Sequence, residues 1–238
     1  MSGGVDRVWT AVTSTQAPPA AGVVAGAAVV TLVLVAWDPA WRRTRHLVTI
    51  AHEGAHGFVA LLAGRRLAGI RLHSDTSGLT VSRGRPSGFG MTATAFAGYV
   101  GPALLGLGAA WLLHEQRAVA LLWSVLLLLA LLLVQIRNWF GLWSVLVAGA
   151  LVFAVSWWGS DPVQSGFAYA GTWFLLLAAP RPVLELQRQR RRGRARDSDA
   201  DLLARLTGVP GLAWVGAFGV VSLGGLALGA WLLVAPLR

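Results

Sequence analysis

The chain has 238 residues, of which 55% are hydrophobic and only 13% are charged, and its mean hydropathy is +0.62. Soluble globular domains carry about twice this share of charged residues, so the composition excludes a soluble fold and predicts an integral membrane protein. The formal charge of +10 comes from arginine without lysine, and eight of the twenty arginines lie between residues 181 and 205. In a chain with apolar spans, the positive-inside rule explains this excess of arginine better than nucleic-acid binding does. We therefore expect no nucleic-acid partner.

Two further features of the composition narrow the chemistry and the source. The sequence contains no cysteine, which excludes disulfides and thiolate ligands, so a transition metal would need histidine, carboxylate or water. Arginine in place of lysine is typical of a GC-rich genome. It indicates a bacterial protein, whose spans would lie in the plasma membrane.

Seven stretches are long and apolar enough to cross about 30 Å of hydrocarbon as helices. They are residues 8–37, 47–64, 93–113, 118–136, 139–160, 162–180 and 206–237. We therefore predict an all-α, polytopic transmembrane helix bundle of about seven spans, with residues 1–238 forming a single integral membrane domain in the lipid bilayer. The positive-inside rule makes residues 181–205 a basic cytoplasmic linker, and six preceding crossings then put the amino terminus in the cytoplasm too. The basic segment 42–45 falls on the far side, against the rule.

The second span carries the pentapeptide His52-Glu53-Gly54-Ala55-His56. Histidines four residues apart lie on one helical face, about 40° and 6 Å from each other, so both rings can reach one zinc ion. Glu53 is then placed as the general base that takes a proton from metal-activated water and later protonates the leaving amine. An ionised side chain at the bilayer centre costs about 3 kcal/mol, and metal binding would compensate for it. The alternative is a polar cluster that only hydrogen-bonds neighbouring helices.

A short hairpin is predicted at residues 69–82, after the motif helix. Ile70, Leu72, Leu79 and Val81 alternate with polar residues around a Ser/Asp/Gly turn. This interfacial β-hairpin could rest against lipid headgroups, or its open edge could accept an extended peptide as an added strand. In the next span, Gly98-x-x-Gly101 is a small-residue spacing that we interpret as a helix-packing signal.

A catalytic zinc ion needs a third protein ligand and an open position for water. Acids cluster just before the last span, where Ser198 followed by Asp201 is typical of a capped helix start. We therefore favour Asp199 as the third ligand, with Asp201 as the alternative. Asn138, between two spans on the same predicted side, could bind substrate backbone or a developing oxyanion, or could satisfy backbone at a tight helix hairpin.

At these residues the chain resembles the site-2 protease family of intramembrane zinc metallopeptidases, in particular its small bacterial branch without extra soluble domains. The resemblance rests on residues 51–57, the hairpin, and the segments 97–102, 137–141 and 198–207. It implies His52 and His56 as Zn²⁺ ligands, Glu53 as base, and cleavage of membrane-protein or peptide substrates near the cytoplasmic face. The family's usual third ligand is an Asp in a Leu-Asp-Gly tripeptide, which this chain lacks.

The sequence therefore predicts an intramembrane zinc metalloendopeptidase that hydrolyses peptide bonds of membrane-protein substrates by metal-activated water. Its active site is expected to face the cytoplasm. The missing tripeptide supports one alternative from another class, a non-proteolytic membrane scaffold or binding protein that retains the peptidase fold.

Overall fold

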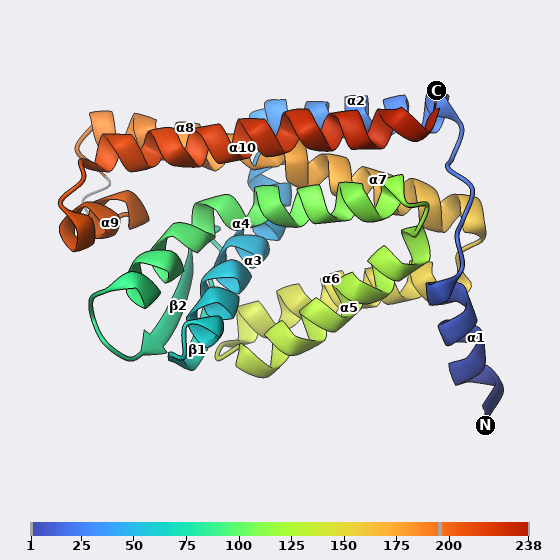
Figure 1. Cartoon of the computed structure of the whole chain (residues 1–238), viewed down its shortest axis with the longest axis horizontal. Helices are drawn as coiled ribbons and strands as arrows, with labels where there is room; N and C mark the ends of the chain where they lie inside the picture. The colour runs from blue at the N-terminus through green and yellow to red at the C-terminus, as the bar shows by residue number, and fades with distance from the viewer. Residues whose placement is uncertain (1, 195–196, 238) are drawn as a thin grey trace.

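The computed structural model describes residues 2–194 and 197–237, and it is 78% helical (Figure 1). Ala195 and Arg196, which belong to the predicted basic linker, lie outside the described residues. The elements in chain order are α1 (Ser2–Thr13), α2 (Ala21–Ala36), α3 (Asp38–Leu62), β1 (Arg66–Leu72), β2 (Gly78–Arg83), α4 (Phe89–His114), α5 (Ala118–Gln135), α6 (Trp139–Trp158), α7 (Asp161–Ala178), α8 (Pro180–Arg191), α9 (Asp199–Thr207), α10 (Gly211–Val234) and the 3-10 turn η1 (Ala235–Leu237).

Fewer helices than predicted have the length and apolarity of a membrane span. Among the described residues, α4, α5, α6 and α10 meet both requirements, and α2 with α3 makes a fifth only if this bent pair counts as one span. The structure therefore supports a polytopic membrane protein with four or five such spans, where the sequence led us to expect about seven. The difference arises at two places. The predicted spans 8–37 and 47–64 correspond to the bent pair of α2 and α3, which counts as at most one span, and the predicted span 162–180 corresponds to α7, which does not meet the requirements.

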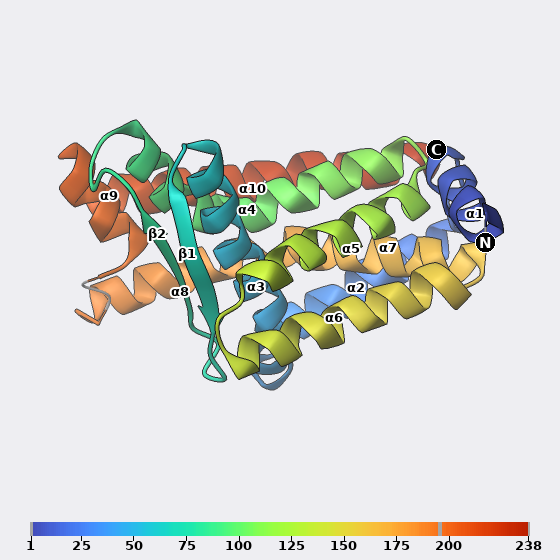
Figure 2. The same cartoon turned by 90° about the horizontal axis from the view of Figure 1, so that it is seen from below.

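The bend between α2 and α3 measures 103° and has a local cause. Trp37 is extended, with φ −86° and ψ 115°, and a proline stands in the first turn of α3, where its missing N–H costs no helical hydrogen bond. Helix α3 therefore runs steeply across the other long helices (Figure 2). The pentapeptide motif is carried on this crossing helix.

The two ends of the bundle carry different elements. Helix α1 and both termini lie at one end, whereas the hairpin and α9 lie at the other (Figures 1 and 2). The sequence led us to expect the amino terminus on the same side as residues 181–205, but the structure separates them, because α3 turns across the bundle. The basic segment itself begins as helix α8, which continues from α7 through a helical Ala179.

The predicted hairpin is confirmed as a two-stranded antiparallel sheet. Ile70 pairs with Thr80 and Leu72 with Gly78, and a register shift falls between Leu67 and Gly69. Ile70 and Leu72 are buried, because this strand packs on the hydrophobic cluster between α3, α5 and α6. The hairpin is thus anchored to the helices by one strand.

Small residues bring the long helices together, as the spacing of Gly98 and Gly101 predicted for α4. A Cβ atom at Gly101 would collide with Ala55 of α3, and one at Gly229 of α10 would lie 2.8 Å from Leu176 Cδ2 of α7. Helices associate in lipid through such close van der Waals contacts, because burying apolar surface provides no driving force for their association inside a bilayer. The close approach of α3 and α4 places the motif against α4.

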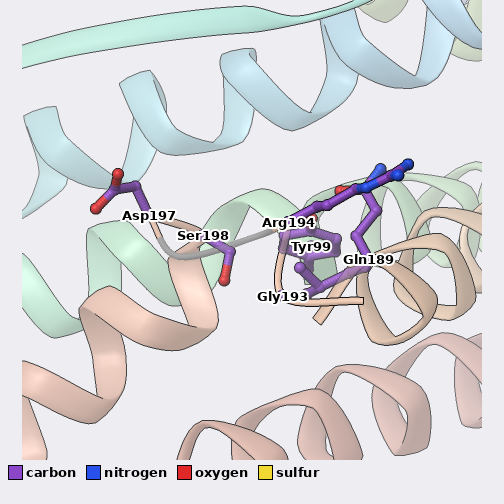
Figure 3. A pocket seen from close by; sticks show the side chains of 7 residues that line it. Tyr99, Gln189, Gly193, Arg194, Asp197 and Ser198 are labelled. Atoms are coloured by element: carbon purple, nitrogen blue, oxygen red, sulfur yellow. The ribbon is translucent and has the colours of Figure 1, made fainter. Parts of the chain in front are cut away.

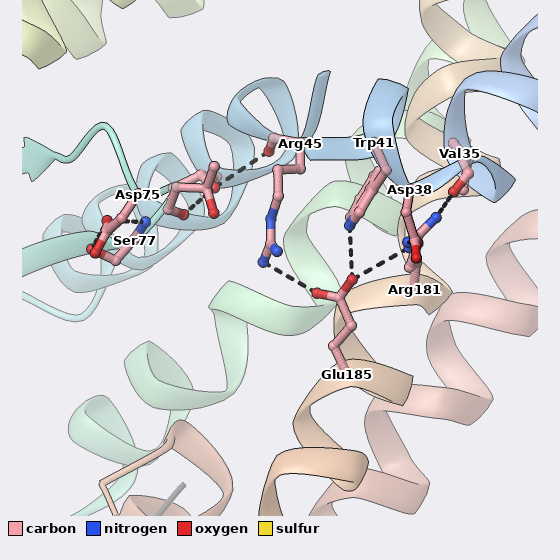
Figure 4. A network of polar contacts seen from close by, with 10 residues as sticks. Val35, Asp38, Trp41, Arg45, Asp75, Ser77, Arg181 and Glu185 are labelled. Carbon is pink, nitrogen blue, oxygen red and sulfur yellow. Dashed lines mark hydrogen bonds and ion pairs between the residues drawn. The ribbon is translucent and has the colours of Figure 1, made fainter. Parts of the chain in front are cut away.

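A polar network fastens the α2–α3 corner to α8 (Figure 4). One oxygen of the Glu185 carboxylate accepts hydrogen bonds from Trp41 Nε1 at 2.7 Å and from Arg181 Nε at 3.3 Å. The other pairs with Arg45 Nη2 at 3.1 Å, and Arg181 also contacts the Val35 carbonyl and Asp38. The Glu185 carboxylate therefore ties α3 to α8, and Arg181 of α8 adds α2 through the Val35 carbonyl.

Replacing Glu185 with alanine should lower the stability of the protein without a direct effect on the motif. Hydrogen bonds to a charged group contribute about 1.5–3 kcal/mol, and their loss leaves Trp41 and two arginines without this partner. We expect a clear fall in the thermal unfolding midpoint in detergent. Glu115→Ala, at the exposed α4–α5 turn, is the control and should leave the midpoint near that of the wild type.

Candidate metal centre

Three side chains from two helices converge at the end of the bundle that carries the hairpin and α9. The Nε2 atoms of His52 and His56, on α3, are 3.0 Å apart. Oδ2 of Asp199, the first residue of α9, lies 3.4 Å from Nε2 of His52 and 3.2 Å from Nε2 of His56. His56 is buried, and the other two are half-buried. Three of the predicted site residues are thus brought together.

The spacing of these three atoms fits a zinc ion. Nitrogen and oxygen ligands bind zinc at about 2.0–2.1 Å, and the edge of a tetrahedron is about 1.6 times that length, or about 3.3 Å. The separations of 3.0, 3.4 and 3.2 Å lie around this value. Two imidazoles with one carboxylate also form a ligand set of catalytic zinc sites, in which the fourth position is left for water.

The ring of His56 is held in the orientation that a metal ligand needs. Its Nδ1 lies 2.7 Å from the carbonyl oxygen of Thr94 on α4. A carbonyl can only accept, so Nδ1 carries the proton, and in the neutral ring Nε2 presents its lone pair to His52 and Asp199. Such outer hydrogen bonds fix the tautomer and orientation of ligating histidines.

Asp199 and Asp201 have different environments, although both belong to the first turn of α9. Ser198 is the N-cap and its side chain accepts from the backbone N–H of Asp201, which confirms the predicted helix start. The Asp201 carboxylate accepts a hydrogen bond from Ser198 Oγ at 2.7 Å and pairs with Arg190 of α8. Burial raises the pKa of Asp201, but Ser198 and Arg190 outweigh it, so the pKa lies below its usual value. Asp201 anchors the helix and Asp199 faces the histidines.

Glu53 is buried beneath the hairpin, with 5% of its surface exposed. Its Oε2 accepts a hydrogen bond of 2.6 Å from Thr80 Oγ1 on β2. The hairpin therefore covers the predicted general base, next in the chain to His52.

Two neighbours of the histidines on α4 were not recognised as site residues from the sequence. Gly98 lies against both rings, and a Cβ atom there would be 2.6 Å from Nε2 of His52 and 2.5 Å from Cε1 of His56. Tyr99 stands edge-on to His52, with ring centroids 4.9 Å apart, and stacks on Phe218 of α10. Gly98 has a role beyond helix packing, since it leaves room at the donor atoms.

An open cavity of about 500 Å³ lies beside this cluster, at the junction of α4, α8 and α9 (Figure 3). Tyr99 and Leu186 line it together with polar side chains near the carboxyl end of α8 and the start of α9, among them Gln189, Arg194 and Ser198. Tyr99 also contacts His52, so its ring stands between the cavity and the histidine pair.

Asn138 lies apart from the three converging donors, at the outer edge of β1. Its Nδ2 donates to the carbonyl of Leu72 at 2.6 Å, and its Oδ1 accepts from the N–H of Leu72 at 3.1 Å. Arg137 N–H also donates to the carbonyl of Ile70 at 2.9 Å. The α5–α6 turn thus pairs with β1 much as a further strand would.

The fold and the cluster describe a helical membrane protein with a candidate metal centre on a bent, crossing helix. The Peptidase M50B-like family matches residues 25–229, and the chain belongs to this site-2 protease family, as the resemblance predicted. Its members are metallopeptidases. Comparison with curated proteins and with solved structures found no match. The matched region runs from α2 to α10 and contains all three converging residues.

Gly98→Ala should weaken zinc binding at the candidate metal centre while the helices stay folded. The added methyl group would occupy the space beside both imidazoles, so we expect zinc affinity to fall by about ten- to a hundredfold, as when a supporting group of a metal site is lost. Zinc per chain, measured by elemental analysis, checks this. Gly108→Ala on the same helix is the matched control, because a Cβ there would meet no described atom within 4 Å apart from its chain neighbours and its own helix backbone. Equal zinc content in the two variants would contradict the role of Gly98.

Proposed function

We propose that this protein is an intramembrane zinc metallopeptidase that hydrolyses peptide bonds of membrane-protein substrates. The observation that carries the proposal is the spacing of 3.0–3.4 Å among the donor atoms of His52, His56 and Asp199. Membership in a metallopeptidase family supports it independently. In this proposal Asp199 is the third ligand, supplied by α9 in the absence of the family's tripeptide.

The chemistry divides between the ion and the residues around it. A bound zinc ion would supply a Lewis acid that lowers the pKa of a water molecule toward about 7. Glu53 would act as the general base that takes a proton from the water attacking the scissile carbonyl carbon, and would then donate that proton to the leaving amine. The buried position of Glu53 strengthens this proton transfer, because bulk water does not compete for the carboxylate.

The hairpin supports a way to present an extended substrate. The outer edge of β1 is occupied by the α5–α6 turn through Asn138 and Arg137. The described sheet has two strands, so β2 keeps a free edge beside Glu53. We propose that a substrate segment adds to this edge as a strand. Asn138 then contributes by holding β1, since both of its polar side-chain atoms are engaged there.

The arrangement of basic segments supports a cytoplasmic active site. Arg45 pairs with Glu185 of α8, so the basic start of α3 lies beside α8 and no longer opposes the positive-inside rule. The hairpin arginines lie at the same end of the bundle as α9. We propose that this end faces the cytoplasm of a bacterial cell, with residues 1–238 as one membrane domain and the amino-terminal helix on the outer side.

Cysteine labelling can determine this orientation, because the native chain has no cysteine that would interfere. Ser14→Cys, after α1, should react with a membrane-impermeant maleimide in intact cells. Ser87→Cys, between β2 and α4, should react only after the cells are permeabilised. Both positions are exposed in the structure, so a reversed pattern would place the metal centre outside.

Glu53→Gln should abolish cleavage and leave the metal in place. The amide cannot take up the proton, and loss of a general base costs about 10²- to 10⁴-fold in rate. Cleavage of β-casein by the purified protein in detergent measures the activity, and elemental analysis measures zinc. Glu115→Gln is the control.

Zinc content also separates the peptidase from the alternative of a non-proteolytic scaffold. About one zinc ion per wild-type chain, lost in His56→Ala, supports the peptidase. A metal-free wild-type protein, or a Glu53→Gln variant that still cleaves, would refute it.

A further inference from the structure

Strand β2 turns one face toward the motif helix. Its alternate residues from Gly78 to Ser82 are half-buried, and the residues between them are exposed. Thr80 and Gly78 are on the inward face, directly over Glu53. The apolar side chains of Leu79 and Val81 point outward, so the strand presents small and polar groups to the helix. The inward face of β2 therefore presents small and polar groups to the acid of the motif helix.

The two oxygens of the Glu53 carboxylate have different neighbours on this strand. Thr80 Oγ1 lies 2.6 Å from Oε2 and 3.1 Å from the backbone carbonyl oxygen of Glu53. An ionised carboxylate and a carbonyl can only accept, so the hydroxyl is the donor to both. At Gly78, a Cβ atom would lie 2.6 Å from Oε1. The hydroxyl thus holds one oxygen, and the glycine backbone lies close to the other.

We propose that Thr80 is a positioning residue, which orients the Glu53 carboxylate so that Oε1 is the oxygen that takes the proton of the attacking water. The terminal torsion of a glutamate is broad, so burial alone does not set the plane of the carboxylate. A short hydrogen bond to Oε2 does set it, and the absence of a side chain at Gly78 leaves space for Oε1. This inference rests on the proposed peptidase function.

The location of Thr80 on the substrate-binding strand makes the positioning specific to catalysis. Thr80 pairs with Ile70 across the sheet, and the opposite edge of β2 is the one proposed to receive the substrate. Loss of the hydroxyl leaves that backbone edge intact, so substrate binding is preserved. We therefore expect Thr80→Val to lower kcat with little change in KM.

A second threonine provides a matched control. Thr49 on α3 donates through Oγ1 to the carbonyl of Thr76 at 2.9 Å, so it also fastens the hairpin to the same helix, away from Glu53. Thr49→Val removes the same atom as Thr80→Val. It reports the effect of loosening the hairpin without a change at the carboxylate.

The experiment measures kcat and KM for β-casein in detergent, zinc per chain, and the affinity of a fluorescent peptidyl hydroxamate. Hydroxamates bind the metal and share a proton with the general base, so this affinity reports the carboxylate without turnover. Thr80→Val should lose about tenfold or more in kcat and in hydroxamate affinity, as expected for a hydrogen bond to a charged group, with zinc and KM preserved. Thr80→Ser should restore most of the loss, and Thr49→Val should resemble the wild type.

Several results would overturn the inference. The hydroxyl does not act through Glu53 if Thr80→Val keeps the wild-type kcat and hydroxamate affinity, or if it loses its zinc. The same conclusion follows if Thr49→Val shows an equal fall in kcat. If Thr80→Val fails to fold, Gly78→Ala is the variant that tests the inference. A methyl group beside Oε1 should lower kcat and leave the zinc content unchanged. A wild-type kcat in Gly78→Ala would contradict the proposed geometry. Failure of the proposed function itself would be recognised separately, since the wild-type protein would then lack both zinc and hydroxamate binding.

Discussion

The structure depends on the convergence of His52, His56 and Asp199 within an otherwise apolar bundle. Removing such groups from water is costly unless each finds a partner, and here the three donor atoms lie within 3.0–3.4 Å of one another. Contacts from the surrounding helices hold these side chains in place. The Thr94 carbonyl turns the second imidazole toward the centre, and the serine cap of α9 with the Arg190–Asp201 pair holds the carboxylate in place.

The bend before α3 determines where this chemistry takes place. A helix parallel to its neighbours would carry the motif through the middle of the bundle, remote from α9. Because α3 crosses steeply, its last turns reach the end at which the hairpin, α4 and α9 meet, and the Glu185 network secures the corner on which the crossing depends (Figure 4). The helix packs closely on α4 through Gly98 and Gly101, so one face of α3 is used both for packing and for the metal centre.

The sequence predicted the elements that local patterns encode. Alternation and turn residues identified the hairpin, the spacing of His52 and His56 identified their shared face, and Ser198 with Asp201 identified the start of α9. The span count was too high for two reasons. Hydropathy contains no information about the bend that joins α2 and α3 into one pair, and α7 is less apolar than a membrane span requires. Gly98 was interpreted only as a packing residue, since its contact with the imidazoles depends on how α4 docks. Thr80 carried no signal of its own beyond the alternation that places it on the same face of β2 as Gly78.

The third donor comes from a short helix that lies outside the long spans and follows the motif by well over a hundred residues. Helix α9 packs on α4, which precedes it, and on α10, which follows it in the chain. While α10 is still being synthesised, both imidazoles can be in place, but α9 lacks one of the two helices on which it packs. The candidate metal centre would therefore be complete only after α10 has packed against α9.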